Sequence, residues 1–252
     1  MNIWTREETI VAFNVYCKIP FKNSSKTHPM IIKYARILGR SPSALNMKVG
    51  NIGRLDPDLR ERGITGLIHG AKMEENIWNE FYGNPELLAF ESEKIIAQML
   101  NQSIENSTAI QIDDLPQGIE RTAIIRQRVN QSFFRSAVMS AYNFKCCISG
   151  VNTPQLVEAC HIVDWSEDTK NRTNPKNGLC MNPFFHKAYD KCLLAISPDM
   201  SIIVSDELFE CVADKMFYIY LKKINGRKIF LPDKFLPDRD FLAVHYNKFI
   251  NR

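Results

Sequence analysis

Residues 158–192 read EACHIVDWSEDTKNRTNPKNGLCMNPFFHKAYDKC, and this stretch decides the fold of the second half of the chain. The apolar run CHIV at 160–163 is followed by a polar loop rich in Asn, Thr, Pro and Lys, which indicates a strand that ends before a loop. Asn182 is a favourable helix N-cap, and Pro183 suits the first helical position. The expected order is strand, loop, strand and then a short helix that ends near Lys191.

Two side chains of this expected helix are candidate metal ligands. His186 and Asp190 stand four residues apart and therefore share one face of the helix. Both side chains can then reach a single divalent cation. Upstream, His161 lies in the apolar run and is the next residue that carries chemistry.

The order His161, Asn177 and His186 resembles the His-Asn-His signature of HNH endonucleases, which fold as a ββα-metal finger. The pair His186-x-x-x-Asp190 sits where colicin-type HNH nucleases carry a His-x-x-x-His metal pair. The sequence pattern AxHIVxW…NRxNPxNGLCxNxxxHxAxD is similar to that of the HNH branch found in prokaryotic restriction-type nucleases.

The resemblance implies a role for each residue of the signature. His161 is the expected general base, because an imidazole with a pKa near neutrality can take a proton from water. His186 and Asp190 are the expected metal ligands, with His186 counted among the catalytic residues. Asn177 is expected to orient His161 or to complete the metal shell.

Cys160 departs from the pattern, because many relatives have Asp or His directly before the base. A thiol suits a soft metal and binds Mg²⁺ poorly. Cys160 is therefore either a third ligand or a packing residue, in which case water fills the ligand position. The resemblance implies a divalent cofactor, with Mg²⁺ or Mn²⁺ expected first and Zn²⁺ or Ni²⁺ as alternatives.

The charge is distributed unevenly along the chain. The formal net charge is only +4, but residues 1–62 carry +6, residues 63–120 carry −8 and residues 121–252 carry +6. Two basic ends around an acidic middle predict two modules that face nucleic acid and a connector kept away from phosphate. The alternative is that the acidic stretch is an ordinary solvated surface.

These observations predict an α+β protein with three parts. Residues 1–90 form a helical domain that binds DNA, residues 91–120 an acidic linker, and residues 121–252 the HNH nuclease domain. The linker is expected to begin with a short helix near residues 91–101.

The helical domain has the layout of a helix-turn-helix unit. Thr5 and Glu8 form a capping box at its first helix, and Gly39 closes a later helix before an expected recognition helix at 43–51. A plain three-helix bundle is the alternative. The candidate DNA contacts are Arg40 for phosphate, Ser43, Asn46 and Lys48 for the major groove, and Arg172, Lys176 and Lys187 in the finger.

Composition narrows the class of protein. Hydrophobic residues make up 45% and charged residues 24% of the 252, which is ordinary for a globular protein. No apolar run is long enough to cross a bilayer, and the start MNIWTREET lacks the apolar core of a signal peptide. Seven scattered cysteines fit a reducing compartment. We expect a cytoplasmic protein with no membrane partner.

The expected function is a metal-dependent endonuclease that acts on double-stranded DNA in restriction or defence against foreign, including modified, DNA. One alternative is a homing or mobile-element HNH nuclease, and another is a DNA-binding regulator on an HNH scaffold that has lost catalysis. A single finger cuts one strand, so a homodimer is expected, with the apolar tail 235–250 as surface for the partner copy.

Overall fold

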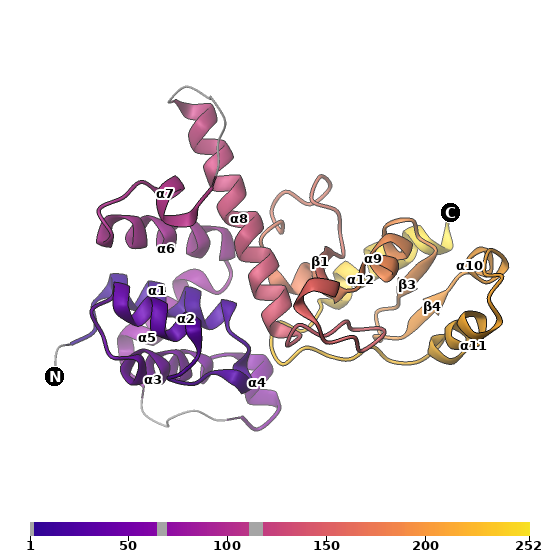
Figure 1. The fold of residues 1–252 in the computed structure, drawn as a ribbon, viewed down its shortest axis with the longest axis horizontal. Coiled ribbons are helices and arrows are strands. Elements are labelled where there is room, and N and C mark those ends of the chain that lie inside the picture. The colour runs from indigo at the N-terminus through magenta and orange to yellow at the C-terminus, as the bar shows by residue number, and fades with distance from the viewer. Residues whose placement is uncertain (1–2, 65–69, 111–117) are drawn as a thin grey trace. The chain divides into compact units, whose positions relative to one another are not determined.

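The structure, a computed structural model, describes residues 3–64, 70–110 and 118–252. The chain forms two compact units, Met1–Ala141 and Tyr142–Arg252, each with its own core (Figure 1). The first unit is helical and the second combines helices with two small sheets, which confirms the predicted α+β class. Among the described helices, none is both long and apolar enough to cross a membrane.

The first unit is built around its first helix, α1 (Arg6–Lys18), which Figure 1 shows between α6 and α3. Residues 8–17 of α1 are all buried, as expected for a helix with neighbours on every side. The predicted capping box starts it, since Thr5 and Glu8 bond each other's main-chain N–H. The other helices are α2 (Pro29–Ile37), α3 (Pro42–Gly53), α4 (Pro57–Glu61), α5 (Lys72–Phe81), α6 (Pro85–Met99), α7 (Ile104–Thr108) and α8 (Ile119–Ala141), with a 3₁₀ turn at Phe21–Asn23.

The stretch expected to be an acidic linker contains the end of α6 and all of α7. Its first residues continue α6, which packs against α1 and α8. Glu93 of α6 is buried because Lys18 of α1 lies 2.8 Å from its carboxylate. Residues 111–117 of the expected linker lie outside the described part of the chain. The contacts group α8 with the first unit, so its assignment to the nuclease domain stays a prediction.

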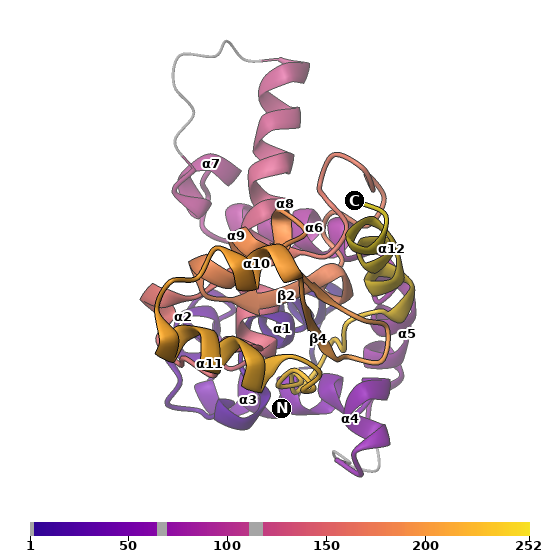
Figure 2. The ribbon, with the colours of Figure 1, turned by 90° about the vertical axis from the view of Figure 1, so that its right-hand side faces the viewer.

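The second unit contains the predicted succession of strand, loop, strand and helix. Strand β1 (Glu158–His161) pairs antiparallel with β2 (Gly178–Met181), and α9 (Pro183–Asp190) follows at once. A second hairpin and three helices complete this unit; α9 and α12 both contact β3 of the hairpin, and Figure 2 shows α12 beside the hairpin. These elements are β3 (Leu194–Ile196), β4 (Ile202–Val204), α10 (Asp206–Glu210), α11 (Lys215–Ile224) and α12 (Arg239–Ile250), with 3₁₀ turns at Pro154–Leu156 and Pro175–Asn177.

The side chain of His245 fastens α12 to α9. Its ring stacks on the ring of Tyr189 with 3.5 Å between centroids. Its Nε2 lies 3.0 Å from the Tyr189 carbonyl oxygen, which can only accept, so Nε2 carries the hydrogen. Nδ1 is buried and has no hydrogen-bond partner among the described residues. Burial lowers the pKa of His245 to about 4.

This lowered pKa predicts that the native state loses stability in mild acid. The unfolded chain protonates His245 near pH 6.5, whereas the native state resists protonation down to about 4. As pH falls from 7 to 5, the contribution of His245 to the free energy of unfolding should drop by about 2 kcal/mol. Urea unfolding at both pH values measures this drop.

The matched control is His245→Phe, which keeps a ring for the stack on Tyr189 and cannot titrate. We expect the difference in unfolding free energy between pH 7 and pH 5 to be smaller in this variant. An equal pH dependence in both proteins would contradict the assignment.

Candidate active site

The register of the two strands positions the candidate site. His161 lies opposite Gly178, and Glu158 lies opposite Met181. The Asn182 side chain accepts a hydrogen bond of 3.0 Å from the Phe185 N–H and so starts α9 directly after β2. Helix α9 packs against both strands (Figure 1), and His186 of this helix reaches Glu158 of β1.

Three of the predicted ligand residues come together here. Donor atoms of Cys160, His186 and Asp190 all lie within 4.8 Å of one another. His186 Nε2 and Asp190 Oδ1 are 3.6 Å apart, and two donors on one tetrahedral ion are separated by roughly 3.4 Å. The donor set therefore fits a divalent metal ion. Burial, with the Asp190 and Glu158 carboxylates, raises the pKa of the Cys160 thiol well above its usual value.

Glu158 belongs to the site, although the sequence interpretation did not include it. Its Oε1 lies 2.6 Å from His186 Nδ1. A carboxylate accepts, so Nδ1 carries the hydrogen and Nε2 keeps the lone pair that a metal needs. The signal that identifies Glu158 is strand alternation, because it stands two residues before Cys160 and shares its face.

His161 is held in the form that a base requires. Its Nε2 lies 2.9 Å from the Arg172 carbonyl oxygen. Since the carbonyl accepts, Nε2 carries the hydrogen and Nδ1 of the neutral ring carries the lone pair. Burial lowers the pKa of His161, which outweighs the Arg172 hydrogen bond and the Asp164 carboxylate that raise it. The ring is therefore neutral at pH 7 and able to take a proton.

Trp165 and Arg172 fix the loop that holds this ring. The edge of Trp165 faces His161 at 5.6 Å between ring centroids, with the planes 81° apart. The Arg172 guanidinium lies over Trp165 at 5.2 Å, and its Nε donates to the Trp165 carbonyl at 2.6 Å. With the carbonyl of Arg172 on His161, the three residues form a closed ring of contacts. The predicted contact between Arg172 and DNA would compete with this arrangement.

Asn177 holds the main chain just beyond His161. Its side chain is almost fully buried, with 1% of its surface exposed. Its Oδ1 accepts from the Val163 N–H at 2.8 Å, and its Nδ2 donates to the Val163 carbonyl at 3.1 Å. These bonds hold the chain two residues beyond His161 and so set where β1 ends. These bonds offer a way for Asn177 to orient His161, and that role stays a prediction.

The predicted DNA contacts of the first unit differ in their exposure and in their partners. Lys48 was expected to contact the major groove, but only 7% of its surface is exposed, and its amine lies 2.6 Å from Glu74 of α5. The Arg40 guanidinium donates to both carboxylate oxygens of Glu8, each at 2.8 Å. Binding of phosphate by either residue would require these ion pairs to open.

The remaining candidates are less constrained. Ser43 is exposed at the start of α3, while Asn46 accepts a hydrogen bond of 2.8 Å from Ser24. In the finger, Lys187 is exposed beside His186, and the carbonyl of Lys176 accepts from the Asp238 N–H at 3.0 Å.

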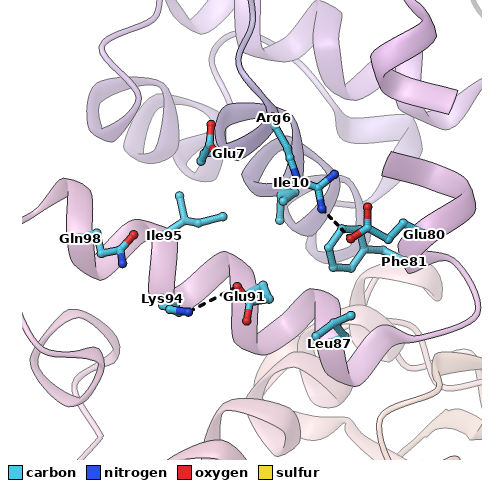
Figure 3. A pocket seen from close by; sticks show the side chains of 10 residues that line it. All are labelled: Arg6, Glu7, Ile10, Glu80, Phe81, Leu87, Glu91, Lys94, Ile95 and Gln98. Carbon is cyan, nitrogen blue, oxygen red and sulfur yellow. Dashed lines mark hydrogen bonds and ion pairs between the residues drawn. The ribbon is translucent and has the colours of Figure 1, made fainter. Parts of the chain in front are cut away.

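A pocket of about 420 Å³ in the first unit has no comparable chemistry. Four apolar side chains contribute to its lining, and four of its five charged side chains form two ion pairs, as Figure 3 shows. Arg6 lies 2.5 Å from Glu80, and Lys94 lies 3.9 Å from Glu91. The finger is therefore the stronger candidate for an active site.

The contact between Glu158 and His186 predicts an effect on metal affinity. Glu158→Ala should weaken binding of Mn²⁺ or Zn²⁺ by about 10–100-fold, because His186 loses the partner that fixes its ring and tautomer. Isothermal titration calorimetry measures the affinity. Glu167→Ala is the matched control, since Glu167 is an exposed carboxylate paired with Lys248. Equal affinity in both variants would remove Glu158 from the site.

Comparison with known proteins covers the finger itself. Residues 146–197 match the model of a family described as HNH endonuclease. The matched segment contains β1, β2, α9 and β3, and therefore every residue of the candidate site. No curated protein matches the chain.

Proposed function

Because residues 146–197 belong to the HNH endonuclease family, we propose that the protein is a metal-dependent DNA endonuclease with His161 as its general base. The observation that carries this proposal is the pairing of a neutral His161 ring with the donor cluster of Cys160, His186 and Asp190 in one finger.

Hydrolysis of a phosphodiester requires a water molecule to lose a proton as it attacks phosphorus. His161 Nδ1 accepts this proton, while the Arg172 carbonyl keeps Nε2 in place and stabilises the imidazolium that forms. His186, Asp190 and Cys160 hold the divalent ion, which when bound supplies positive charge for the phosphate and the leaving 3′ oxygen. Glu158 keeps Nε2 of His186 turned toward the ion.

The biological role we propose is restriction of foreign DNA. Support comes from the similarity of the finger to restriction-type HNH nucleases and from the succession α2, Gly39 turn and α3 in the first unit. Under this proposal the first unit contacts double-stranded DNA and the finger cuts it in the cytoplasm. A homing nuclease and a regulator without catalysis are the competing functions.

His161→Ala tests the proposed chemistry. Nicking of supercoiled plasmid, assayed with Mg²⁺, Mn²⁺, Zn²⁺ and Co²⁺ in turn, should fall by about 10²–10⁴-fold with whichever ion supports it, the usual contribution of a positioned base, and EDTA should abolish it in the wild type. Binding of metal and of DNA should persist. His28→Asn is the control, because it removes an imidazole but keeps an oxygen that can cap α2 in place of the His28 ring nitrogen.

The outcomes separate the competing functions. Gel shift of DNA without any cleavage by the wild type would favour a regulator. Undiminished nicking by His161→Ala would show that another group takes the proton. Cleavage of DNA that carries modified bases, with unmodified DNA left intact, would support a role in defence.

We also propose a homodimer, in which two fingers related by a twofold axis cut both strands. Part of the tail 235–250 points inward, since Phe235 and Leu242 are 5% and 0% exposed. Val244 and Ile250 remain exposed on α12, at 43% and 55%. Light scattering of the full chain should give twice the monomer mass of 29.0 kDa, and Val244→Asp should shift it toward the monomer. A monomeric protein that cuts both strands would rule the dimer out.

A further inference from the structure

The Cys160 sulfur decides which ion the finger holds, and we infer that the site selects a thiolate-binding divalent ion of the zinc and cobalt class over Mg²⁺. This inference takes the metal dependence of the proposed nuclease as its premise and concerns the identity of the ion alone. It is carried by the place of Cys160 in the donor cluster.

Cys160 cannot turn away from an ion that His186 and Asp190 hold. It lies inside β1, where the ladder pairs it with Leu179 of β2, and its side chain has no exposed surface. The Asp190 side chain, by contrast, keeps 49% of its surface exposed. The sulfur therefore lies at the buried end of the site and the carboxylate at its exposed end. An ion held by the imidazole and the carboxylate would have the sulfur as a neighbour.

This donor set suits one class of ion and not the other. Mg²⁺ prefers six oxygen ligands in near-octahedral geometry, whereas Cys160 and His186 offer sulfur and nitrogen. Zn²⁺ and Co²⁺ accept sulfur, nitrogen and oxygen together in four-coordinate sites. Three protein donors then leave one position open at the exposed end, as in catalytic zinc sites. On binding, the S–H bond breaks, a sulfur–metal bond forms and the proton passes to solvent.

A packing role for Cys160 predicts a different absorption spectrum. The Cys160 thiol lies 3.3 Å from the carbonyl oxygen of His161, a weak contact that a packing residue can also make. If Cys160 only packs, the ion has two protein ligands and water, and no bond to sulfur. The two roles differ in whether light absorption reports a sulfur–metal bond.

The test is a titration of the full-length protein, stripped of metal by a chelator, with Co²⁺. A sulfur–cobalt bond gives a thiolate-to-cobalt charge-transfer band in the near ultraviolet. We expect this band to saturate at one ion per chain, to disappear when Zn²⁺ is added and to persist in a large excess of Mg²⁺. Binding of Co²⁺ seen by calorimetry without the band would overturn the inference, as would displacement of Co²⁺ by Mg²⁺ at comparable concentration.

Three variants assign the band to the finger. Cys160→Ala should abolish it, and Cys180→Ala is the matched control, because Cys180 is equally buried on β2 and lies outside the donor cluster. Asp190→Ala alters an exposed side chain and so spares folding; it should keep the band but weaken Co²⁺ binding by at least about tenfold. A band that survives Cys160→Ala, or a Co²⁺ affinity unchanged by Asp190→Ala, would overturn the inference.

The spectrum and DNA cleavage can fail independently. A saturating band in a protein that cuts no DNA with any ion would support the thiolate site and refute the proposed nuclease. Cleavage that depends on Mg²⁺ in a protein without the band would do the reverse.

Discussion

The finger depends on one buried amide. The side chain of Asn177 exchanges two hydrogen bonds with the main chain of Val163, and its carbonyl oxygen accepts a hydrogen bond from the Ile162 N–H. The side chain thereby continues the pairing of β1 with β2 beyond its last residue pair. Without the amide, the buried N–H and C=O of Val163 would lose their partners, at roughly 1–3 kcal/mol for each group. The loop between β1 and β2, whose Arg172 carbonyl contacts His161, would lose this support as well.

The register that Asn177 maintains gives two adjacent residues opposite tasks. Successive side chains of a strand point to opposite faces, so Cys160 faces the ligands of α9 while His161 faces the loop that ends at Arg172. Glu158 shares the face of Cys160 and reaches His186 for the same reason. The proposed metal ligand and the proposed base can therefore be neighbours in the chain while each is oriented by different partners. One short strand would position both groups that the proposed chemistry needs.

The sequence predicts the parts of this site that depend on local rules. Asn182 and Pro183 start α9 as expected, and the spacing of His186 and Asp190 places both on one face because a helix has a fixed period. The contact of Glu158 with His186 spans 28 residues and depends on how the strand meets the helix, which no local pattern specifies. The burial of Lys48 was missed for the same reason, since its partner Glu74 comes from a separate helix.

Ion pairs between residues far apart in the sequence explain the uneven charge along the chain. Four basic residues of the N-terminal stretch pair with acids of the acidic middle: Arg6 with Glu80, Lys18 with Glu93, Lys48 with Glu74 and Arg54 with Glu75. Two of these pairs are largely removed from solvent, where an unpaired charge would be costly. The basic start and the acidic middle thus offset each other within the first unit through two largely buried and two more exposed ion pairs, and residues 1–120 together carry a net charge of −2. The net positive charge of the chain therefore comes from residues 121–252, the part of the chain that contains the finger.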